Sequence, residues 1–439
     1  MIETLKNAWK VEETRKKLFY TLLLIIVFRI GSVFVTAPFI STDVVKDWLA
    51  SNSENSALGY LNLFSGGAME KATVFALGIQ PFINASIIVQ LLTYAIPPLE
   101  RLSKEGEEGR KKIDKISNFV SLGLGIFMAF AYYLTMKKAG ALVYTSGFEG
   151  TFSAIVIITV FITGCMGVVW IGNRISEKGI GNGVSILIFI GILANIPTGL
   201  MNIIDAAKNQ PNPYVFVAVG IILLFIFIIG FIVYMNEAER RIPIQYAKRV
   251  VGRKQYGGQS THIPIKVIMS GVMPIIFANA FVSLPMTIGM FFPAKADGTS
   301  AWDKFYYGFQ KWFSYRSAPY AIALFILIIA FNYFYVSMQY NPIEIANNLR
   351  QSNGGIPGIR PGKPTSDYIQ RVLSKITLVG AIFLGFIAVI PCIIAALFPQ
   401  IGSLALGGTS VLILVSVALE TVRTLESQLM MRHHKGFLE

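Results

Sequence analysis

Long apolar stretches recur along the chain and are separated by short polar segments. A helix needs roughly 20 mostly apolar residues to cross a lipid bilayer. By this length criterion the stretches predict ten membrane-spanning helices, near residues 18–37, 74–96, 117–136, 152–171, 183–203, 214–235, 266–292, 318–338, 374–392 and 401–422. The second and seventh are the least regular. The first is too long for the apolar core of a signal peptide, and no small-residue cleavage site follows it, so we expect it to be retained.

The polar segments between the predicted spans differ in charge from one side to the other. With ten spans both termini lie on one side, which holds 28 of the 38 lysines and arginines, against nine on the opposite side. Arg29 lies inside the first span. Cytoplasmic loops of membrane proteins carry an excess of lysine and arginine. The asymmetry therefore predicts cytoplasmic termini, and it supports the number of spans because a miscounted span would scramble it.

The composition agrees with a membrane protein. Apolar residues make up 54% of the 439 residues and charged residues 14%, whereas a soluble domain carries about 25% charge. The mean hydropathy is +0.59. A soluble fold this apolar could not bury its hydrophobic surface, and no linker or polar domain interrupts the chain. We therefore expect one all-α membrane domain.

Glycine, proline and asparagine break the apolar pattern at corresponding places in two five-span halves, residues 1–205 and 206–439. The second and seventh spans share one pattern, and the fifth and tenth open on glycine-rich runs. Interrupted helices at matching positions indicate an inverted repeat with a pathway at its interface, although glycine and proline are common in membrane helices generally. The interruptions are Gly78, Pro81 and Asn84, then Gly271, Pro274 and Asn279, and the runs 179–183 and 407–410.

A short apolar segment, 58–69, precedes the second span and contains the glycine pair Gly66 and Gly67. It is too short to cross a membrane. Such a segment re-enters the membrane only where protein surrounds it, so it is either a re-entrant stopper or a loop on the surface. Arg29 costs about 3 kcal/mol on insertion scales unless it finds a partner. It is either a structural arginine bonded to carbonyl groups or a functional one.

The two largest cytoplasmic loops, 236–265 and 339–373, are rich in arginine and lysine. The first alternates like a strand from Ile242 to Tyr246, and the second presents Arg360 among glycine and proline turns. Both loops are either docking surfaces for an acidic or RNA-bearing partner or simply the charge that fixes the orientation.

No residue pattern in the chain predicts catalysis. Cys165 and Cys392 lie in apolar stretches and are expected to be packed, and His433 and His434 are adjacent, which is not a helical ligand spacing. The spans hold no clustered catalytic groups, which argues against a membrane enzyme. They also lack the buried ionisable residues that ion-coupled transporters use. We expect a gated pore with no cofactor, with a secondary transporter and a membrane enzyme as alternatives.

Six segments of the chain resemble the SecY family, the channel subunits of the bacterial protein translocase. The resemblance covers essentially the whole chain, and its closing part is similar to Gram-positive members. The segments are 62–68, 75–88, 179–183, 259–264, 357–362 and 407–410.

The resemblance implies two inverted five-helix halves around a central pore, which a short plug helix near 58–67 closes from outside. The plug corresponds to Leu61, Asn62, Leu63, Phe64, Ser65, Gly66 and Gly67. A narrow ring of aliphatic side chains corresponds to Ile79, Ile83, Val184, Ile188, Ile276 and Ile413. Val184 stands where isoleucine is commoner, which affects only the tightness of the ring.

The resemblance also implies a lateral gate between the second and seventh spans, with Asn84, Gln90 and Asn279 as its polar residues. Contacts with the SecA motor or the ribosome correspond to Arg241, Lys248, Arg249 and Arg360. The implied protein is a protein-conducting channel of a bacterial plasma membrane. It passes unfolded secretory proteins across and releases transmembrane segments sideways into lipid. Its implied partners are the small membrane subunits SecE and SecG, signal peptides, and nascent or precursor polypeptides, with no nucleic acid beyond ribosomal RNA.

Overall fold

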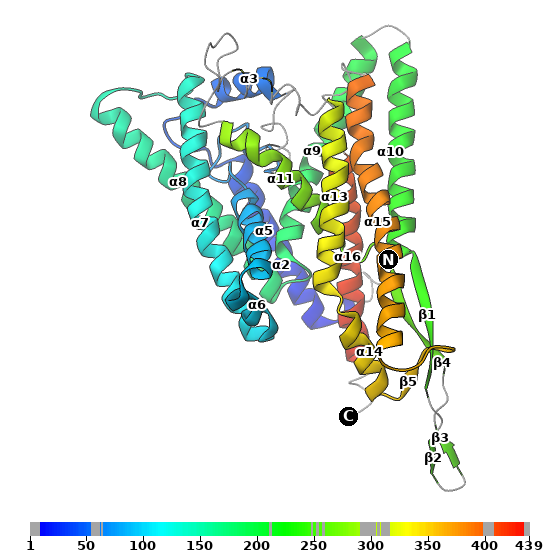
Figure 1. Cartoon of the computed structure of the whole chain (residues 1–439). Coiled ribbons are helices and arrows are strands. Elements are labelled where there is room, and N and C mark those ends of the chain that lie inside the picture. Colours follow the sequence, from blue (N-terminus) through cyan, green and yellow to red (C-terminus); the bar gives the residue numbers. More distant parts are fainter. Residues whose placement is uncertain are drawn as a thin grey trace.

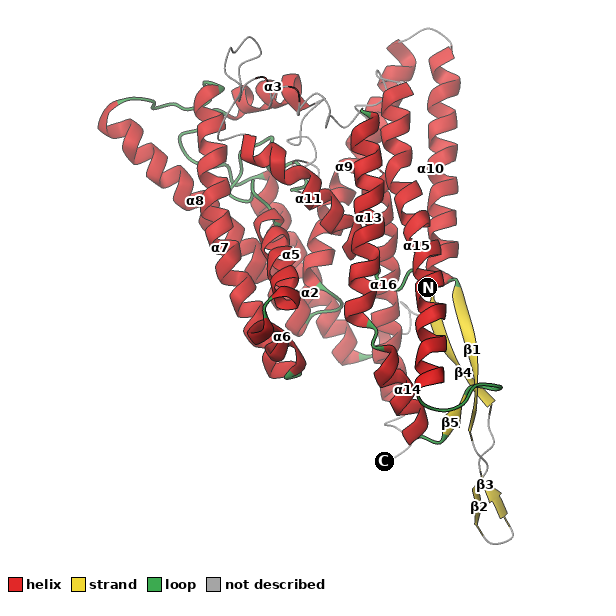
Figure 2. Cartoon of the chain, viewed as in Figure 1, coloured by secondary structure: helices red, strands yellow, loops and turns green. Residues whose placement is uncertain are grey.

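The computed structural model shows a mostly helical protein with its strands gathered at one end (Figure 2). It describes residues 9–53, 62, 65–209, 213–246, 249–251, 254–256, 260–289, 304, 308, 317–397 and 408–433.

In the predicted first half the helices are α2 (Glu12–Val33), α3 (Thr42–Ser53), α5 (Gln80–Ala95), α6 (Pro97–Lys104), α7 (Glu107–Lys138), α8 (Gly147–Lys178) and α9 (Gly183–Asn209). In the predicted second half they are α10 (Pro213–Glu237), α11 (Met273–Gly289), α13 (Ala318–Gln339), α14 (Pro342–Gln351), α15 (Lys363–Leu397) and α16 (Gly408–His433). Several long helices, among them α10, α13, α15 and α16, run side by side along the long direction of the molecule, whereas α3 lies across one end (Figure 1).

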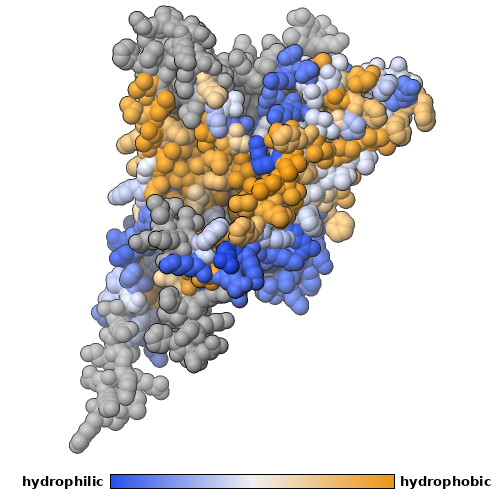
Figure 3. Space-filling view, turned by 180° about the vertical axis from the view of Figure 1, so that it is seen from behind, coloured by the Kyte–Doolittle hydropathy of each residue, from blue (hydrophilic) through white to orange (hydrophobic). Residues whose placement is uncertain are grey.

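Each of the ten predicted spans overlaps one of these helices. Within the described residues, four helical segments are long and apolar enough to cross a membrane, or five if the bent pair α5 and α6 is one span. The outward faces of the helices carry large apolar side chains, among them Phe148 of α8, Phe227 of α10 and Phe386 of α15, each more than 60% exposed. Seen from behind, hydrophobic residues form a band across the middle of the molecule, with hydrophilic residues gathered below it (Figure 3). An exposed apolar surface of this extent belongs against lipid or a partner.

The second and seventh predicted spans begin later than the hydropathy indicated. Helix α5 begins at Gln80 rather than near 74, and α11 begins at Met273 rather than near 266. The preceding glycines, Gly78 and Gly271, have φ angles of +55° and +61°, which an L-residue with a side chain rarely adopts. A proline in the first turn of each helix then starts it with a preset φ. The predicted interruptions therefore mark helix starts.

A second feature repeats in the two halves. An ideal Cβ on Gly164 of α8 would lie 1.9 Å from the carbonyl oxygen of Val74, and one on Gly380 of α15 would lie 2.5 Å from that of Val267. Both carbonyls belong to the segments just before α5 and α11. Glycine allows this close approach of a backbone to a helix because it has no Cβ. The same kind of contact thus lies at the start of α5 and of α11, the second predicted span of each half.

Three of the described helices, α3, α6 and α14, and a strand pairing were not predicted. Helix α3 covers part of the segment expected to be a polar loop, and its Val45 and Leu49 are buried. Helix α6 bends by 101° from α5. The predicted strand over 242–246 is confirmed as β1 (Glu239–Tyr246), but its partner β4 (Ser260–Lys266) went unnoticed.

Strand β1 lies in the middle of a three-stranded sheet of order β4-β1-β5, which we call the docking sheet. Ile242 of β1 is opposite Ile263 of β4, and Gln245 is opposite Gly355 of β5 (Gly354–Gly355). The two large loops that the sequence presents separately are therefore one structure. Strands β2 (Arg249–Val251) and β3 (Lys254–Tyr256) form a second pair beyond it.

The largest buried cluster joins both predicted halves. Its residues come from α2, α5, α8, α9, α10, α11, α13, α15 and α16. A second cluster packs α3 and the segment 65–79 against α7 and α8. Cys165 and Cys392 are buried and not bridged to each other, as expected.

Candidate functional site

The six residues of the predicted aliphatic ring, which we call the collar, belong to one buried cluster. Five of them are at most 6% exposed, and Val184 is partly buried against the same cluster. They come from four helices: Ile79 and Ile83 at the start of α5, Val184 and Ile188 in α9, Ile276 in α11 and Ile413 in α16.

The starts of these helices position the collar. Ile79 directly follows Gly78 and caps α5, so Ile83 lies one turn further on the same face. Helix α9 begins close against α8, because a Cβ on Gly183 would lie 1.9 Å from the carbonyl oxygen of Gly172. A Cβ added to Gly172 would lie 3.6 Å from a side-chain carbon of Val184 and 3.7 Å from one of Ile79. This places collar side chains of α5 and α9 beside each other.

The buried part of the described structure holds polar side chains but no charged ones. Among the residues that the structure describes, the buried polar side chains other than tyrosine and cysteine are all serine, threonine, asparagine or glutamine. Ser410 lies one turn before Ile413, and its hydroxyl has no hydrogen-bond partner. A buried aliphatic cluster of this kind can exclude water.

Four of the predicted plug residues are described, and they form a compact turn; Leu61, Leu63 and Phe64 lie outside the described residues. The Ser65 hydroxyl donates to the Asn62 carbonyl at 3.0 Å and accepts from the Met69 amide at 3.2 Å. The Asn62 side chain accepts from the Glu70 amide at 3.0 Å. These bonds tie the end of the predicted plug to the segment that leads into α5.

Arg29 of α2 reaches the glycine pair at the end of the predicted plug. Its Nη1 atom donates to the Gly66 carbonyl oxygen over 3.4 Å. Gly66 is buried and has a φ of +68°. Of the two alternatives for this arginine, the structure shows the bond to a carbonyl group.

The predicted lateral-gate residues lie on α5 and α11, which pack against each other. Asn84 and Asn279 are 7% and 4% exposed, and each leaves a buried side-chain atom, Oδ1 and Nδ2 respectively, without a partner. Gln90 is only partly buried and donates to Ser86 on its own helix at 3.4 Å. The structure thus buries the two asparagines in the helix pair and leaves Gln90 nearer its surface.

The docking sheet and the turn beside it present two of the predicted partner contacts. Arg241 of β1 is exposed and donates to Glu239 at 2.7 Å. Arg360 is exposed in the turn between β5 and α15, where its carbonyl accepts from the Thr365 hydroxyl at 2.8 Å. Arg249 lies in β2, with its side chain outside the described part, and Lys248 lies outside it altogether.

Comparison with known proteins decides the family. The SecY family model matches residues 73–422. A relative from Mycobacterium tuberculosis, "Protein translocase subunit SecY", is 41% identical over 458 residues and covers 100% of both chains. The protein of the same description from Streptomyces coelicolor is 40% identical over 451 residues, again with 100% of both chains. The chain belongs to the SecY family.

Solved structures agree with the SecY fold. One described as "The structure of a protein conducting channel" superposes with a TM-score of 0.62 at 19% identity, over 94% of this chain and 91% of that one. A second, on the plug domain of the SecY protein, gives 0.58 at 19% identity with the same coverage. Sec61 in a canine ribosome–channel complex gives 0.59 at 18% identity, again with that coverage. At such identities the likeness concerns the fold.

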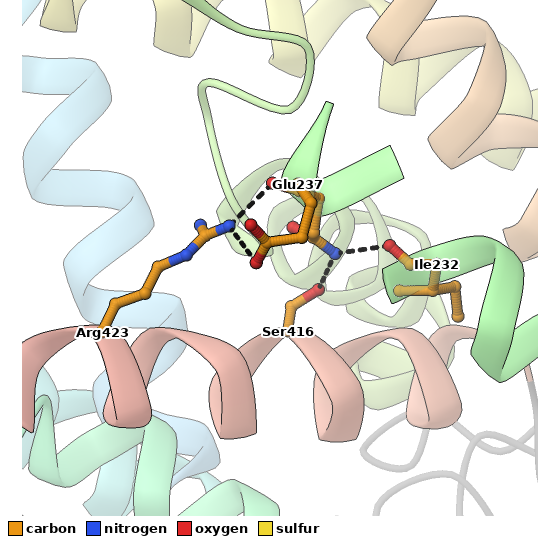
Figure 4. A network of polar contacts seen from close by, with 5 residues as sticks. Ile232, Glu237, Ser416 and Arg423 are labelled. Carbon is orange, nitrogen blue, oxygen red and sulfur yellow. Dashed lines mark hydrogen bonds and ion pairs between the residues drawn. The ribbon is translucent and has the colours of Figure 1, made fainter. Parts of the chain in front are cut away.

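One contact network of this SecY-family chain was missed by the sequence analysis. Arg423 of α16 donates to the Asn236 carbonyl at 2.9 Å and to the Glu237 carboxylate at 2.8 Å (Figure 4). The Asn236 side chain donates to the Ser416 hydroxyl at 3.2 Å and to the Ile232 carbonyl at 3.1 Å. The network fastens the end of α10, where β1 begins, to the helix that carries Ile413. An arginine near the end of a span looks like ordinary orientation charge, so its sequence context does not distinguish it.

Proposed function

We propose that this chain forms the pore of a protein-conducting channel in a bacterial plasma membrane. Two inverted five-helix halves, 1–205 and 206–439, enclose the collar, and all ten predicted spans cross the membrane with both termini cytoplasmic. The observation that supports this best is the packing of the six collar residues, five of them buried, in one cluster contributed by helices of both halves.

An apolar collar suits a pore that must pass polypeptides and hold back ions. Water leaves a narrow aliphatic constriction, and ions then face a large cost of desolvation there. An extended polypeptide crosses the same thin layer with its polar groups only briefly out of water. Flexible aliphatic side chains close around cargo of different shapes, whereas a charged residue in the collar would keep it wet.

The segment 58–67 is proposed as a plug that rests on the outer side of the collar. The turn at Asn62, Ser65 and Gly66 supports this, because it ties the end of the segment to residues leading into α5. The plug domain named in the description of one similar structure is said there to stabilise the closed state of that channel.

We propose the contact between α5 and α11 as the lateral gate. Unpaired polar atoms on Asn84 and Asn279 weaken this helix contact, since a buried polar atom without a partner destabilises the packing around it. Opening would expose a passing segment to lipid. At about −0.5 kcal/mol per leucine and about +3 kcal/mol per lysine, a 20-residue segment would then be sorted by partitioning.

The docking sheet and the Arg360 turn are proposed as the contact surface for the SecA motor or the ribosome, including its RNA. Both are exposed, basic and joined in one structure at the end of the molecule that we assign to the cytoplasm. SecE and SecG are the proposed small membrane partners, and signal peptides and precursor chains the proposed cargo.

The pore assignment is tested with a secretory precursor arrested midway through export. Photo-crosslinking residues are placed at Ile83 and Ile276, and as a matched control at Ile326 of α13, an isoleucine that is 59% exposed on the outer surface. We expect adducts with the arrested chain from both collar positions and none from the control. Lack of adducts at either collar position, or equal adducts at Ile326, would remove the assignment.

A further inference from the structure

Arg29 is the one basic residue that lies well inside a predicted span rather than at its edge, and the structure gives it a specific partner. It lies in the last third of α2 and is partly buried. Its guanidinium donates to the backbone carbonyl of Gly66, 37 residues further along the chain. A charged group at this depth is costly, so its placement calls for a function or a partner.

Gly66 is the point where three parts of the molecule meet. An ideal Cβ on this residue would lie 2.9 Å from Nη1 of Arg29 and 3.0 Å from the Cα of Gly191 in α9. The chain therefore turns at Gly66 in a space closed on one side by α2 and on the other by α9. The Arg29 guanidinium can reach the Gly66 carbonyl only while this turn stays between the two helices.

The residues after Gly66 are fixed by other contacts. Met69 accepts a 2.6 Å hydrogen bond from the Tyr132 hydroxyl of α7 through its carbonyl, and Glu70 is bonded to Asn62 at its amide. The bond from Arg29 reaches the turn at its plug-proximal end. Like the bond between Glu70 and Asn62, it holds a residue of the proposed plug itself, and it does so from a separate helix, α2.

The chemistry of the bond suits a contact that must break. At 3.4 Å it is longer than the usual 2.7–3.2 Å range of N–H···O hydrogen bonds, and its acceptor is neutral. A carboxylate partner in a poorly hydrated interior would hold the guanidinium far more strongly. If the Gly66 carbonyl and the Arg29 guanidinium separate and become exposed to water, each replaces the lost hydrogen bond with bonds to water.

We propose that Arg29 is a positioning residue of the plug. It holds the plug in its closed position by a hydrogen bond to the Gly66 carbonyl, and this bond breaks when the channel opens. This rests on the proposed role of segment 58–67 as a plug. Arg29 acts through the plug and needs no contact with the passing polypeptide.

The test is the resting ion conductance of the full-length channel in planar bilayers. We compare the unmodified chain, Arg29→Met, Arg29→Lys, deletion of 58–67, and the deletion combined with Arg29→Met. We expect the deletion and Arg29→Met each to raise conductance several-fold, with Arg29→Lys between Arg29→Met and the unmodified chain because it keeps one donor. Once the plug is gone, Arg29→Met should add nothing.

The outcomes separate the two proposals. If the deletion does not raise conductance, segment 58–67 is not a plug and the proposed function loses its seal. If the deletion is leaky and Arg29→Met is not, only the role of Arg29 is wrong. A similar rise from Arg29→Met with and without the plug would show that Arg29 acts elsewhere, and would also overturn the inference.

A pair of glycine variants tests the same contact without removing the charge, in case the Arg29 variants do not accumulate. Gly66 and Gly67 both have positive φ angles, +68° and +81°, so alanine strains the backbone at both. Only at Gly66 does the new Cβ meet Arg29 and Gly191; at Gly67 the nearest atom is Asn195 Oδ1, at 3.8 Å. We expect Gly66→Ala to leak clearly more than Gly67→Ala. Equal conductance of the two would contradict the inference.

Discussion

At the scale of single residues, the side chains that matter most are aliphatic ones brought together from distant parts of the chain. Ile188 and Ile413 are at most 1% exposed, although one belongs to α9 and the other to α16. Neither residue is unusual in an apolar stretch. Their shared cluster makes them distinctive, because a pore closes only where apolar side chains from several helices meet.

Replacing Ile188 with asparagine should open the collar to water. The amide would keep water in the constriction, so the resting ion conductance should rise several-fold, while Ile188→Val keeps the position apolar and should stay near the unmodified level. Single-channel recordings of the purified variants check this. A tight Ile188→Asn channel would mean that Ile188 does not line the constriction.

At the scale of elements, close helix crossings fix where α5 and α11 begin. Gly164 and Gly380 admit the backbone that leads into these helices, and Gly78 and Gly271 then turn it. Within eight residues of Gly78 or Gly271 follow three collar residues, Ile79, Ile83 and Ile276, and two gate residues, Asn84 and Asn279. The start of each helix therefore determines which of its side chains face the interior.

Adding one methyl group at such a crossing should destabilise the protein. Overpacking a tight contact costs about 1–3 kcal/mol, and the Cβ of Gly164→Ala would lie 1.9 Å from the Val74 oxygen. Gly123→Ala in α7 is the matched control, since its Cβ meets nothing within 4 Å. Thermal unfolding in detergent should show a lower Tm for Gly164→Ala, and a Tm equal to or above the unmodified value for Gly123→Ala. Equal melting of the two variants would contradict the close approach.

At the scale of the whole molecule, the surface proposed for partners is tied to a helix that carries a collar residue. Pairing of Gln245 with Gly355 joins the two basic loops. Arg423 then fastens the root of the docking sheet to α16, which carries Ile413 (Figure 4). A partner that pulls on the sheet therefore acts on a helix of the collar through few intervening contacts.

Charge reversal at Arg360 should weaken motor-driven export. Arg360→Glu places a carboxylate on an exposed turn, so we expect a several-fold loss of SecA-dependent export with an unchanged melting temperature. Lys111→Glu in α7 makes the same change of net charge on the side that we assign to the cytoplasm, away from the docking sheet. Export of a precursor into membrane vesicles is the measurement. Normal export by Arg360→Glu, or equal loss in Lys111→Glu, would exclude a specific contact.

The sequence by itself determined which segments belong in an apolar environment and which in water. This was enough to predict most of the helices. About twenty consecutive apolar residues require lipid or a buried site whatever the rest of the fold is. Each apolar stretch could therefore be predicted independently of the others. The strand at Ile242–Tyr246, the burial of both cysteines and the SecY family also followed from local patterns. Hydropathy failed at the starts of α5 and α11, because the residues before Gln80 and Met273 are apolar but turn at glycine.

Only the tertiary structure decided which distant residues meet. Arg29 and Gly66, Arg423 and Glu237, and Gln245 and Gly355 each lie far apart along the chain, and nothing in the local composition of either member identifies the other. The collar residues were matched through family resemblance, whereas their common burial is a property of packed helices. Hydrophobicity is fixed by each side chain alone, but a specific contact depends on the backbone geometry of both partners.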